Sequence, residues 1–216
     1  MTWLINNLGR VGELLGIHTL LSLSAIAAAT LLSIPLGRLA AGSRRFGGVV
    51  LGALSLLYAI PSLPMLVVIP VILGIPVRSP LNMVIVLTLY GIAVLVTQVA
   101  EGFRSLPQDV VEAASALGLN PQQRFWRVEL PLAVPVLIAG LRVVTASTVS
   151  LVTVGAIVGV QSLGILFTDG FQRQLPESLL TGLGATLLLA LVLDLLIVLL
   201  GRLLTPWQRK RKEVRA

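Results

Sequence analysis

Five long apolar segments alternate with shorter polar ones along the chain. A helix that spans a bilayer needs about 20 predominantly apolar residues, and each segment reaches that length. The pattern therefore predicts an all-α integral membrane protein, with residues 1–216 forming a single transmembrane domain of five spanning helices. The predicted spans are residues 17–37, 47–74, 81–100, 132–160 and 179–204.

The second of these segments is overlong and contains the sequence AIPSLP. Each proline removes a backbone donor and disfavours helix at the preceding residue, which predicts a break near residues 60–64. In lipid, a broken backbone has to be covered by protein or line a cavity. Two interpretations stay open, an ordinary proline kink and part of a translocation path. The candidate path residues are Tyr58, Ile60, Pro61, Ser62 and Tyr90.

The distribution of basic residues predicts the topology. Five spans place the termini on opposite sides, and basic residues concentrate in cytoplasmic loops. If the loop at residues 38–45 is cytoplasmic, the external side keeps only Arg10, Arg78 and Arg173. The cytoplasmic side then carries Arg38, Arg44, Arg45, Arg104, Arg124, Arg127, Arg202, Arg209, Lys210, Arg211, Lys212 and Arg215. We therefore expect an external N-terminus, with segment 101–131 and the basic tail 205–216 in the cytoplasm.

Composition supports a membrane protein and narrows its chemistry. Hydrophobic residues make up 56% of the chain and charged residues only 12%, against about 25% in soluble domains. The net charge of +7 follows from topology, so we expect the lipid bilayer as a partner and no nucleic acid. With no cysteine and a single histidine, His18, neither a metal site nor a cofactor is expected.

Segment 101–131, between the third and fourth spans, is a polar island with its own helix signals. Ser105-Leu106-Pro107-Gln108 predicts a capping box, and Gly118 predicts the end of the short helix after it. Asn120 and Pro121 then predict the start of a second short helix, ending where the fourth span begins. Gln123 is placed to reach back to the cap.

Two interpretations of this island are compatible with its residues. It is either an amphipathic segment that rests on lipid headgroups or a docking surface for a soluble partner, with aromatic anchors rimmed by charge.

A known family shares the spacing within this island. Glu112-Ala113-Ala114, then Gly118, then Val128-Glu129-Leu130-Pro131 resembles the EAA loop of permease subunits of binding-protein-dependent ATP-binding-cassette importers. Only Val128 departs from that pattern, which usually has Ile there. The resemblance implies a coupling helix seated in a groove of a cytoplasmic ATPase. Its coupling residues would be Glu112, Ala113, Ala114 and Gly118, with Phe125 and Trp126 as anchors.

Finer resemblances point to permeases that import glycine betaine, choline, carnitine or proline. They lie in HTLLS at 18–22, IPLG at 34–37, IPSL at 60–63, LPLAVP at 130–135, AGLR at 139–142 and GVQSLG at 159–164. The family implies a pair of ATPase subunits, a second permease subunit, identical or similar, and an external substrate-binding protein. That receptor is expected to be a separate polypeptide. A permease for methionine or another amino acid is the alternative.

The residue inventory agrees with this division of labour. A phosphate-binding loop needs a lysine after glycine, but the only lysines are Lys210 and Lys212 and neither follows one. We therefore expect no enzyme activity in the chain itself. A small channel or scaffold would fit the hydropathy equally well. A secondary transporter is expected to be larger and to show internal repeats.

Two opposite charges lie inside predicted spans. Arg142 is ten residues into the fourth span and Asp194 is ten residues before the end of the fifth. At about 1.5 Å per residue, both lie roughly 15 Å from the same boundary, so an ion pair is possible. An intramembrane charge is a functional candidate. The alternatives are a structural clamp between two helices and a contact with a neighbouring subunit.

Overall fold

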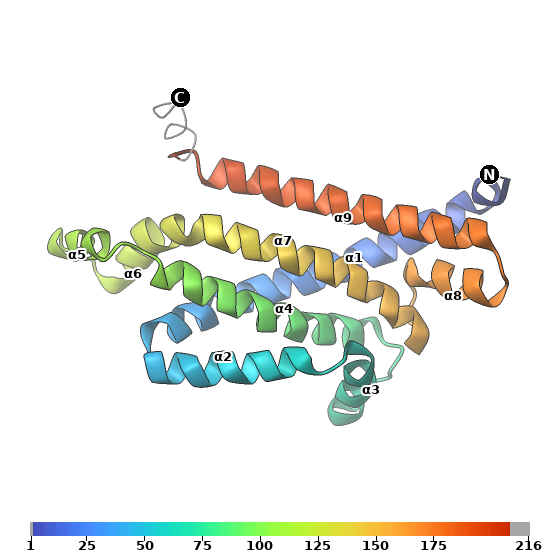
Figure 1. Ribbon diagram of the computed structural model, residues 1–216, viewed down its shortest axis with the longest axis horizontal. Helices are drawn as coiled ribbons and strands as arrows, with labels where there is room; N and C mark the ends of the chain where they lie inside the picture. The colour runs from blue at the N-terminus through green and yellow to red at the C-terminus, as the bar shows by residue number, and fades with distance from the viewer. Residues whose placement is uncertain (1, 208–216) are drawn as a thin grey trace.

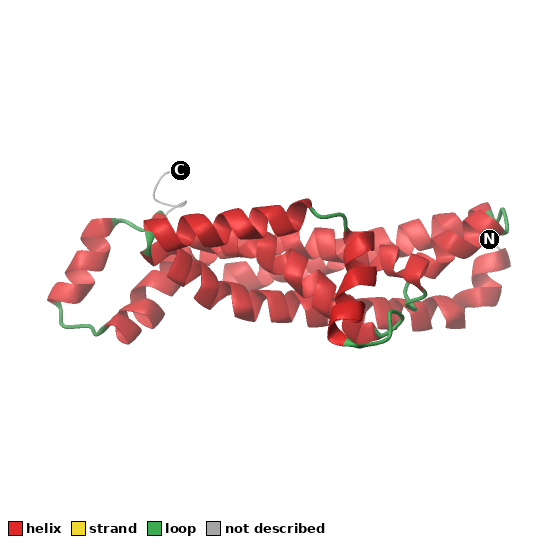
Figure 2. Cartoon of the chain, turned by 90° about the horizontal axis from the view of Figure 1, so that it is seen from below, coloured by secondary structure: helices red, strands yellow, loops and turns green. Residues whose placement is uncertain are grey.

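The structure, a computed structural model, describes residues 2–207, and these form helices joined by short turns (Figures 1 and 2). The basic residues Arg209, Lys210, Arg211, Lys212 and Arg215 of the predicted tail lie outside this range. The helices are α1 (Thr2–Gly42), α2 (Arg44–Ala59), α3 (Ser62–Leu73), α4 (Pro80–Arg104), α5 (Gln108–Ala116), α6 (Pro121–Arg124), α7 (Leu130–Val154), α8 (Gly164–Gln172) and α9 (Pro176–Leu204). A π-turn (Phe125–Glu129) precedes α7, and a 3₁₀ turn (Gly155–Val158) comes after it.

The prediction of an all-α membrane protein is confirmed. Four helical segments within residues 2–207 are long and apolar enough to cross a bilayer, and they contain α1, α4, α7 and α9. Helices α2 and α3 make a fifth span only if they are taken together, because they are bent by 108° at the break between them. The count of five therefore depends on this bent pair.

Helix α1 extends well before the predicted span that starts near residue 17. Its 41 residues correspond to about 60 Å, twice the thickness of a hydrocarbon core. Arg10 and Glu13 are polar but do not break a helix, so hydropathy finds the apolar part and misses the extension. Near the start of α1, Arg10 pairs with Asp169 of α8 at 2.7 Å.

Close packing of α1, α4 and α7 forms the middle of the bundle. At their crossing, a Cβ atom on Gly91 of α4 would lie 2.6 Å from Cβ of Ala29 and 3.3 Å from Cγ1 of Val144. Small residues at such crossings let helices approach closely within a membrane.

The break between α2 and α3 leaves a carbonyl that another helix satisfies. In a continuous helix the carbonyl of Ile60 would accept a hydrogen bond from residue 64, but Pro64 has no N–H. The hydroxyl of Tyr90, a buried residue of α4, donates to this oxygen instead. The bend is therefore covered by protein on one side, as lipid requires.

The same arrangement recurs inside α3. Pro70 cannot donate to the carbonyl of Leu66, and the buried side chain of Asn82 in α4 donates to it at 2.9 Å. The same amide also donates to the carbonyl of Val77 at 2.9 Å. Asn82 thus ties both α3 and the turn after it to the core of the bundle.

The connections gather at two ends of the elongated bundle. The turn from α1 to α2, the helices α5 and α6, and the C-terminal end of α9 lie at one end, here called the loop end (Figure 1). The N-terminus and α8 lie at the other, here called the opposite end (Figure 1). The described basic residues at the loop end are Arg38, Arg44, Arg45, Arg104, Arg124, Arg127 and Arg202.

Candidate functional site

Helices α5 and α6 form a two-helix projection at the loop end of the bundle (Figures 1 and 2). They lie between α4 and α7, where the sequence predicted a polar loop with two short helices. We refer to residues 105–129 as the coupling loop.

The predicted capping box at Ser105 is wrong. The N–H of Ser105 still donates to the carbonyl of Glu101 at 2.9 Å, so this residue closes α4 and does not open α5. Its hydroxyl donates to the carbonyl of Gly102 at 2.9 Å, within the last turn of α4. Helix α5 begins after Pro107, which has no side-chain cap.

Gly118 ends α5, as predicted. Its φ of +79° lies in the left-handed region, which glycine adopts without the penalty of a Cβ atom. The N–H of Leu119 donates to the carbonyl of Ala114 at 3.3 Å, and that of Gly118 donates to Ser115 at 3.0 Å. These two bonds are the pattern of a Schellman motif, which satisfies the final carbonyls of a helix.

The cap at the start of α6 is also confirmed. The side chain of Asn120 accepts from the N–H of Gln123 at 2.8 Å, and the side chain of Gln123 accepts from the N–H of Asn120 at 3.1 Å. Reciprocal bonds of this kind define a capping box, and Pro121 occupies the first helical position. The turn between α5 and α6 is therefore held from both sides.

The second short helix does not end at Pro131, contrary to prediction. It continues through the π-turn Phe125–Glu129 into α7, and the N–H of Leu130 donates to the carbonyl of Phe125. In a π-helical turn an N–H donates to the carbonyl five residues earlier, so the turn is wider than in an α-helix. Pro131, which has no N–H to donate, directly follows this wider turn. A proline was therefore compatible with a continuous helix from α6 into the membrane.

The two predicted aromatic anchors contact each other edge to face, with centroids 5.0 Å apart, but differ in exposure. Phe125 packs inward, with its ring centroid 5.8 Å from that of Phe103 in α4. Trp126 is 61% exposed, and Leu117 beside the α5–α6 turn is 81% exposed. Trp126 and Leu117 are therefore the most exposed large apolar side chains of the coupling loop, while the partly buried Phe125 packs against the bundle.

Glu112 and Ala113 are exposed on α5, whereas Ala114 is buried. Glu112 lines a cavity of about 510 Å³ between the coupling loop and the ends of α1 and α4. Three arginines, Arg38, Arg104 and Arg124, line the same cavity. The glutamate of the predicted motif therefore lines a cavity that also contains a second acid, Glu129.

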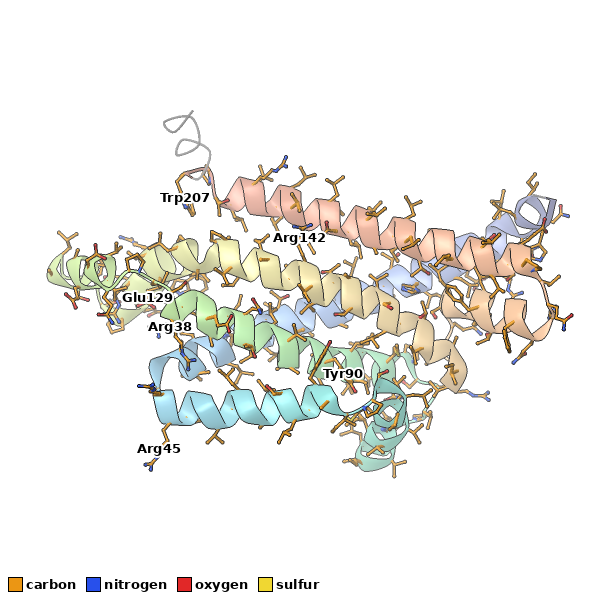
Figure 3. The ribbon with its side chains drawn as sticks, viewed as in Figure 1. Arg38, Arg45, Tyr90, Glu129, Arg142 and Trp207 are labelled. Atoms are coloured by element: carbon orange, nitrogen blue, oxygen red, sulfur yellow. The ribbon has the colours of Figure 1, made fainter. Side chains whose placement is uncertain are left out.

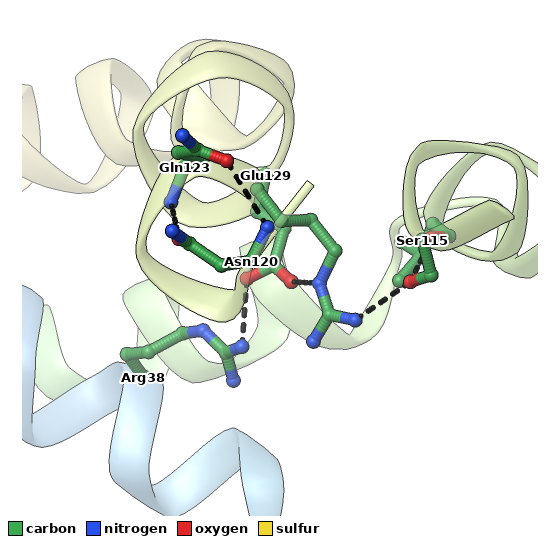
Figure 4. Close-up of polar contacts among 7 residues, drawn as sticks. Arg38, Ser115, Asn120, Gln123 and Glu129 are labelled. Carbon is green, nitrogen blue, oxygen red and sulfur yellow. Dashed lines mark hydrogen bonds and ion pairs between the residues drawn. The ribbon is translucent and has the colours of Figure 1, made fainter. Parts of the chain in front are cut away.

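Glu129 is a buried acid that the sequence identified only as part of the resemblance to the EAA loop, without a role of its own. Its residue is 3% exposed, and Arg124 Nε donates to Oε1 at 2.8 Å (Figure 4). Arg38 Nη2 in α1 lies 2.7 Å from Oε2. A sequence signal existed, since Glu129 is an acid among Arg124 and Arg127 directly before an apolar span, but Arg38 is too distant in sequence to be identified as the partner.

The candidate path residues gather around the break between α2 and α3. The rings of Tyr58 and Tyr90 meet edge to face with centroids 5.9 Å apart, and Tyr90 donates to Ile60. Tyr58, Ile60 and Pro61 are exposed, Ser62 is partly so, and Tyr90 is buried. A role of these residues in translocation stays a prediction.

Arg142 of α7 and Asp194 of α9 lie together. Arg142 Nε donates to Oδ1 of Asp194 at 2.6 Å, and Nη2 donates to Oδ2 at 2.9 Å. The two side chains keep 49% and 33% of their exposure, so this bidentate pair is not buried in the core. Figure 3 shows Arg142 between α7 and α9. Its role as clamp, functional group or subunit contact stays a prediction.

Comparisons with known proteins place the chain among transport permeases. The osmoprotectant import permease protein OsmW of Salmonella typhimurium is 31% identical over 209 residues, covering 94% of this chain and 96% of OsmW. The glycine betaine/carnitine/choline transport system permease protein OpuCD of Bacillus subtilis is 30% identical, covering 90% of this chain and 84% of OpuCD. The choline transport system permease protein OpuBB of Bacillus subtilis is 27% identical, with 88% and 86% covered.

The fold is shared with a solved transporter. An inward-facing structure of the MetNI methionine ABC transporter matches with a TM-score of 0.73 at 21% identity, covering 94% of this chain and 96% of the matched chain. At this identity the likeness concerns the fold alone. Residues 33–210 match the family described as "Binding-protein-dependent transport system inner membrane component". The chain belongs to this family of inner-membrane permease components of binding-protein-dependent transport systems.

Proposed function

We propose that this chain is the membrane-spanning subunit of an ATP-driven importer of osmoprotectants such as glycine betaine, choline, carnitine or proline. Two permease subunits, identical or similar, bind a pair of ATPase subunits on the cytoplasmic side and an external substrate-binding protein on the other. The coupling loop is the observation that carries this proposal. It projects from the loop end, is held by two defined caps and presents Trp126 and Leu117 outward.

A loop of this construction fits docking better than it fits resting on lipid. The Schellman turn and the capping box fix the angle between α5 and α6, and Phe125 fixes the pair to α4. A partner groove gains affinity from a preorganised ligand, because less conformational freedom is lost on binding. Exposed aromatic residues with charges around them are also typical anchors of protein interfaces.

The sequence relatives favour osmoprotectants over methionine as substrate. The three relatives described above, named for choline, glycine betaine, carnitine or osmoprotectants, are 27–31% identical over most of this chain. The methionine transporter shares 21% and supports the fold alone. A quaternary ammonium is usually held by several aromatic rings. Tyr58 and Tyr90 are the only tyrosines or tryptophans within the five predicted spans, which are too few rings for such a cage. High-affinity selection is therefore assigned to the separate binding protein.

The substrate proposal has a direct test. The permease is reconstituted in liposomes with its ATPase and binding protein, and uptake of labelled glycine betaine, choline, carnitine, proline and methionine is compared at equal protein. We expect ATP-dependent uptake of one or more of the first four, with none in the absence of the binding protein. Uptake of methionine alone would replace the osmoprotectant assignment and retain the importer.

The proposed orientation has its own test. A cysteine introduced at Gly42 or Gln122, both at the loop end, is expected to be shielded from an impermeant thiol reagent in intact cells. A cysteine at Gln172, at the end of α8, is expected to be labelled. The chain contains no natural cysteine, so each variant carries a single reactive site. The reverse labelling pattern would place the coupling loop outside and contradict the proposed docking to a cytoplasmic ATPase.

A further inference from the structure

Glu129 is buried where the coupling loop enters the bundle. A buried carboxylate is costly unless it is paired and hydrogen-bonded. Here Oε1 accepts a hydrogen bond from Arg124 Nε at 2.8 Å, and Oε2 lies 2.7 Å from Arg38 Nη2 in an ion pair that lacks hydrogen-bond alignment (Figure 4). The Glu129 side chain is only 4% exposed, whereas those of Arg38 and Arg124 keep 33% and 26% of their exposure, so water screens the arginines in part and the carboxylate little.

The two arginines belong to different parts of the molecule. Arg124 is in α6, and its Nη1 also donates to Ser115 Oγ of α5 at 2.9 Å. Arg38 is in the last turns of α1, and its guanidinium lies 5.6 Å from the ring centroid of Phe103 in α4. Glu129 is thus the point at which both short helices of the coupling loop meet α1.

Helix α1 connects the two ends of the bundle. It packs along α4, carries Arg38 at the loop end and pairs through Arg10 with Asp169 of α8 at the opposite end (Figure 1). Energetic coupling between distant sites is carried by packed helices and by ion-pair networks. Pro35 interrupts the hydrogen-bond ladder of α1 about one turn before Arg38, but α1 packs against α4 on both sides of it, at Ala29 and at Gly37.

We propose that Arg38 and Glu129 form the link through which motion of the coupling loop reaches α1. The link rests on the proposed function, since the motion comes from an ATPase bound to the loop. Arg124 and Glu129 hold the shape of the loop, and Arg38 transmits its displacement. Both residues of the link are positioning residues, because neither touches substrate.

The substitution Arg38→Met separates transmission from loop shape. It leaves the Glu129–Arg124 pair intact and neutral, and the methionine side chain keeps apolar contact beside Phe103. Arg45→Met is the matched control, because Arg45 is exposed on α2 at the same end, points away from the bundle and loses the same charge (Figure 3). Arg38→Lys retains the charge and serves as the conservative variant.

The first measurement uses the permease by itself. Spin labels are placed on cysteines introduced at Gln122 of α6 and at Leu31, an exposed residue of α1. Electron–electron double resonance is expected to give a narrow distribution of label-to-label distances in the parent and in Arg45→Met. The distribution is expected to be broader in Arg38→Met, and in Arg38→Lys it is expected to be close to that of the parent. An unchanged distribution in Arg38→Met overturns the link.

The second measurement uses the complete transporter in liposomes. Uptake per ATP hydrolysed is expected to fall about tenfold in Arg38→Met, within the range by which residues of a coupling network change coupling. Co-elution of the ATPase stays as in Arg45→Met, whereas the thermal unfolding midpoint is lower because Oε2 of the buried Glu129 loses its arginine. Arg38→Lys recovers most of the uptake. Unchanged uptake per ATP overturns the proposal.

Two further outcomes are distinguishable. If Arg38→Met loses the ATPase, the pair shapes the loop and the transmission proposal is wrong. If the wild-type chain neither binds an ATPase nor takes up substrate, the proposed function fails, while the label distances still decide whether Arg38 joins the loop to α1.

Discussion

Gly118→Val is expected to leave the permease folded and inserted but to abolish uptake. The φ of Gly118 is +79°, where a residue with a Cβ atom costs about 1–2 kcal/mol. This is small against the roughly 5–15 kcal/mol that stabilises a typical domain, so the fold survives. The Schellman turn, however, is expected to shift, which changes the angle between α5 and α6. In addition, no atom of the free permease lies within 4 Å of a Cβ atom at this position, so the valine side chain would occupy space that is open to a partner.

Two variants control this prediction. Gly118→Asn adds a side chain but tolerates a left-handed backbone, so it separates occupied space from backbone strain. Gly48→Val adds the same branched side chain on exposed α2, where no atom lies within 4 Å of the new Cβ, and uptake should stay within about twofold. Co-elution with the ATPase, binding-protein-stimulated hydrolysis and uptake are measured for each. Wild-type values of all three in Gly118→Val would refute the docking interpretation of the coupling loop.

Breaking the pair between Arg142 and Asp194 is expected to lower stability strongly. Asp194 lies in an otherwise apolar stretch of α9, and its bidentate bonds to Arg142 join α9 to α7. Arg142→Gln or Asp194→Asn leaves one charge without its partner in a membrane segment, which is unfavourable. Each single variant should therefore unfold at a lower temperature in detergent, and the double variant should lose less than the sum of the two.

The pair between Arg10 and Asp169 provides the matched control. It has similar exposure but lies near the N-terminal end of α1, where a solvent-screened pair contributes little. Asp169→Asn should change the unfolding midpoint less than Asp194→Asn. If the losses from Arg142→Gln and Asp194→Asn are simply additive, the two side chains are not coupled and the clamp interpretation is wrong.

Local sequence signals predicted much of the fold and of the coupling loop. Apolar runs identified the membrane helices, Gly118 identified the end of α5, and Asn120, Pro121 and Gln123 identified the start of α6. Each of these features depends on residues within one or two helical turns. The error at Ser105 has the same origin, because a capping sequence is also compatible with the last turn of a preceding helix.

The tertiary structure decided which distant residues meet. The carbonyl of Ile60 is free because of Pro64, a local fact, but only the packing of α4 against α2 and α3 brings Tyr90 to it. The π-helical segment Phe125–Glu129 has a wider turn than an α-helix, which alters how α7 is rotated relative to α6. Sequence spacing placed Arg142 and Asp194 at equal depth, whereas the rotation of α7 and α9 about their axes aligned them. Hydropathy and caps are determined by neighbours along the chain, while the partners of Ile60, Arg142 and Glu129 depend on helix rotation and packing, which local sequence does not specify.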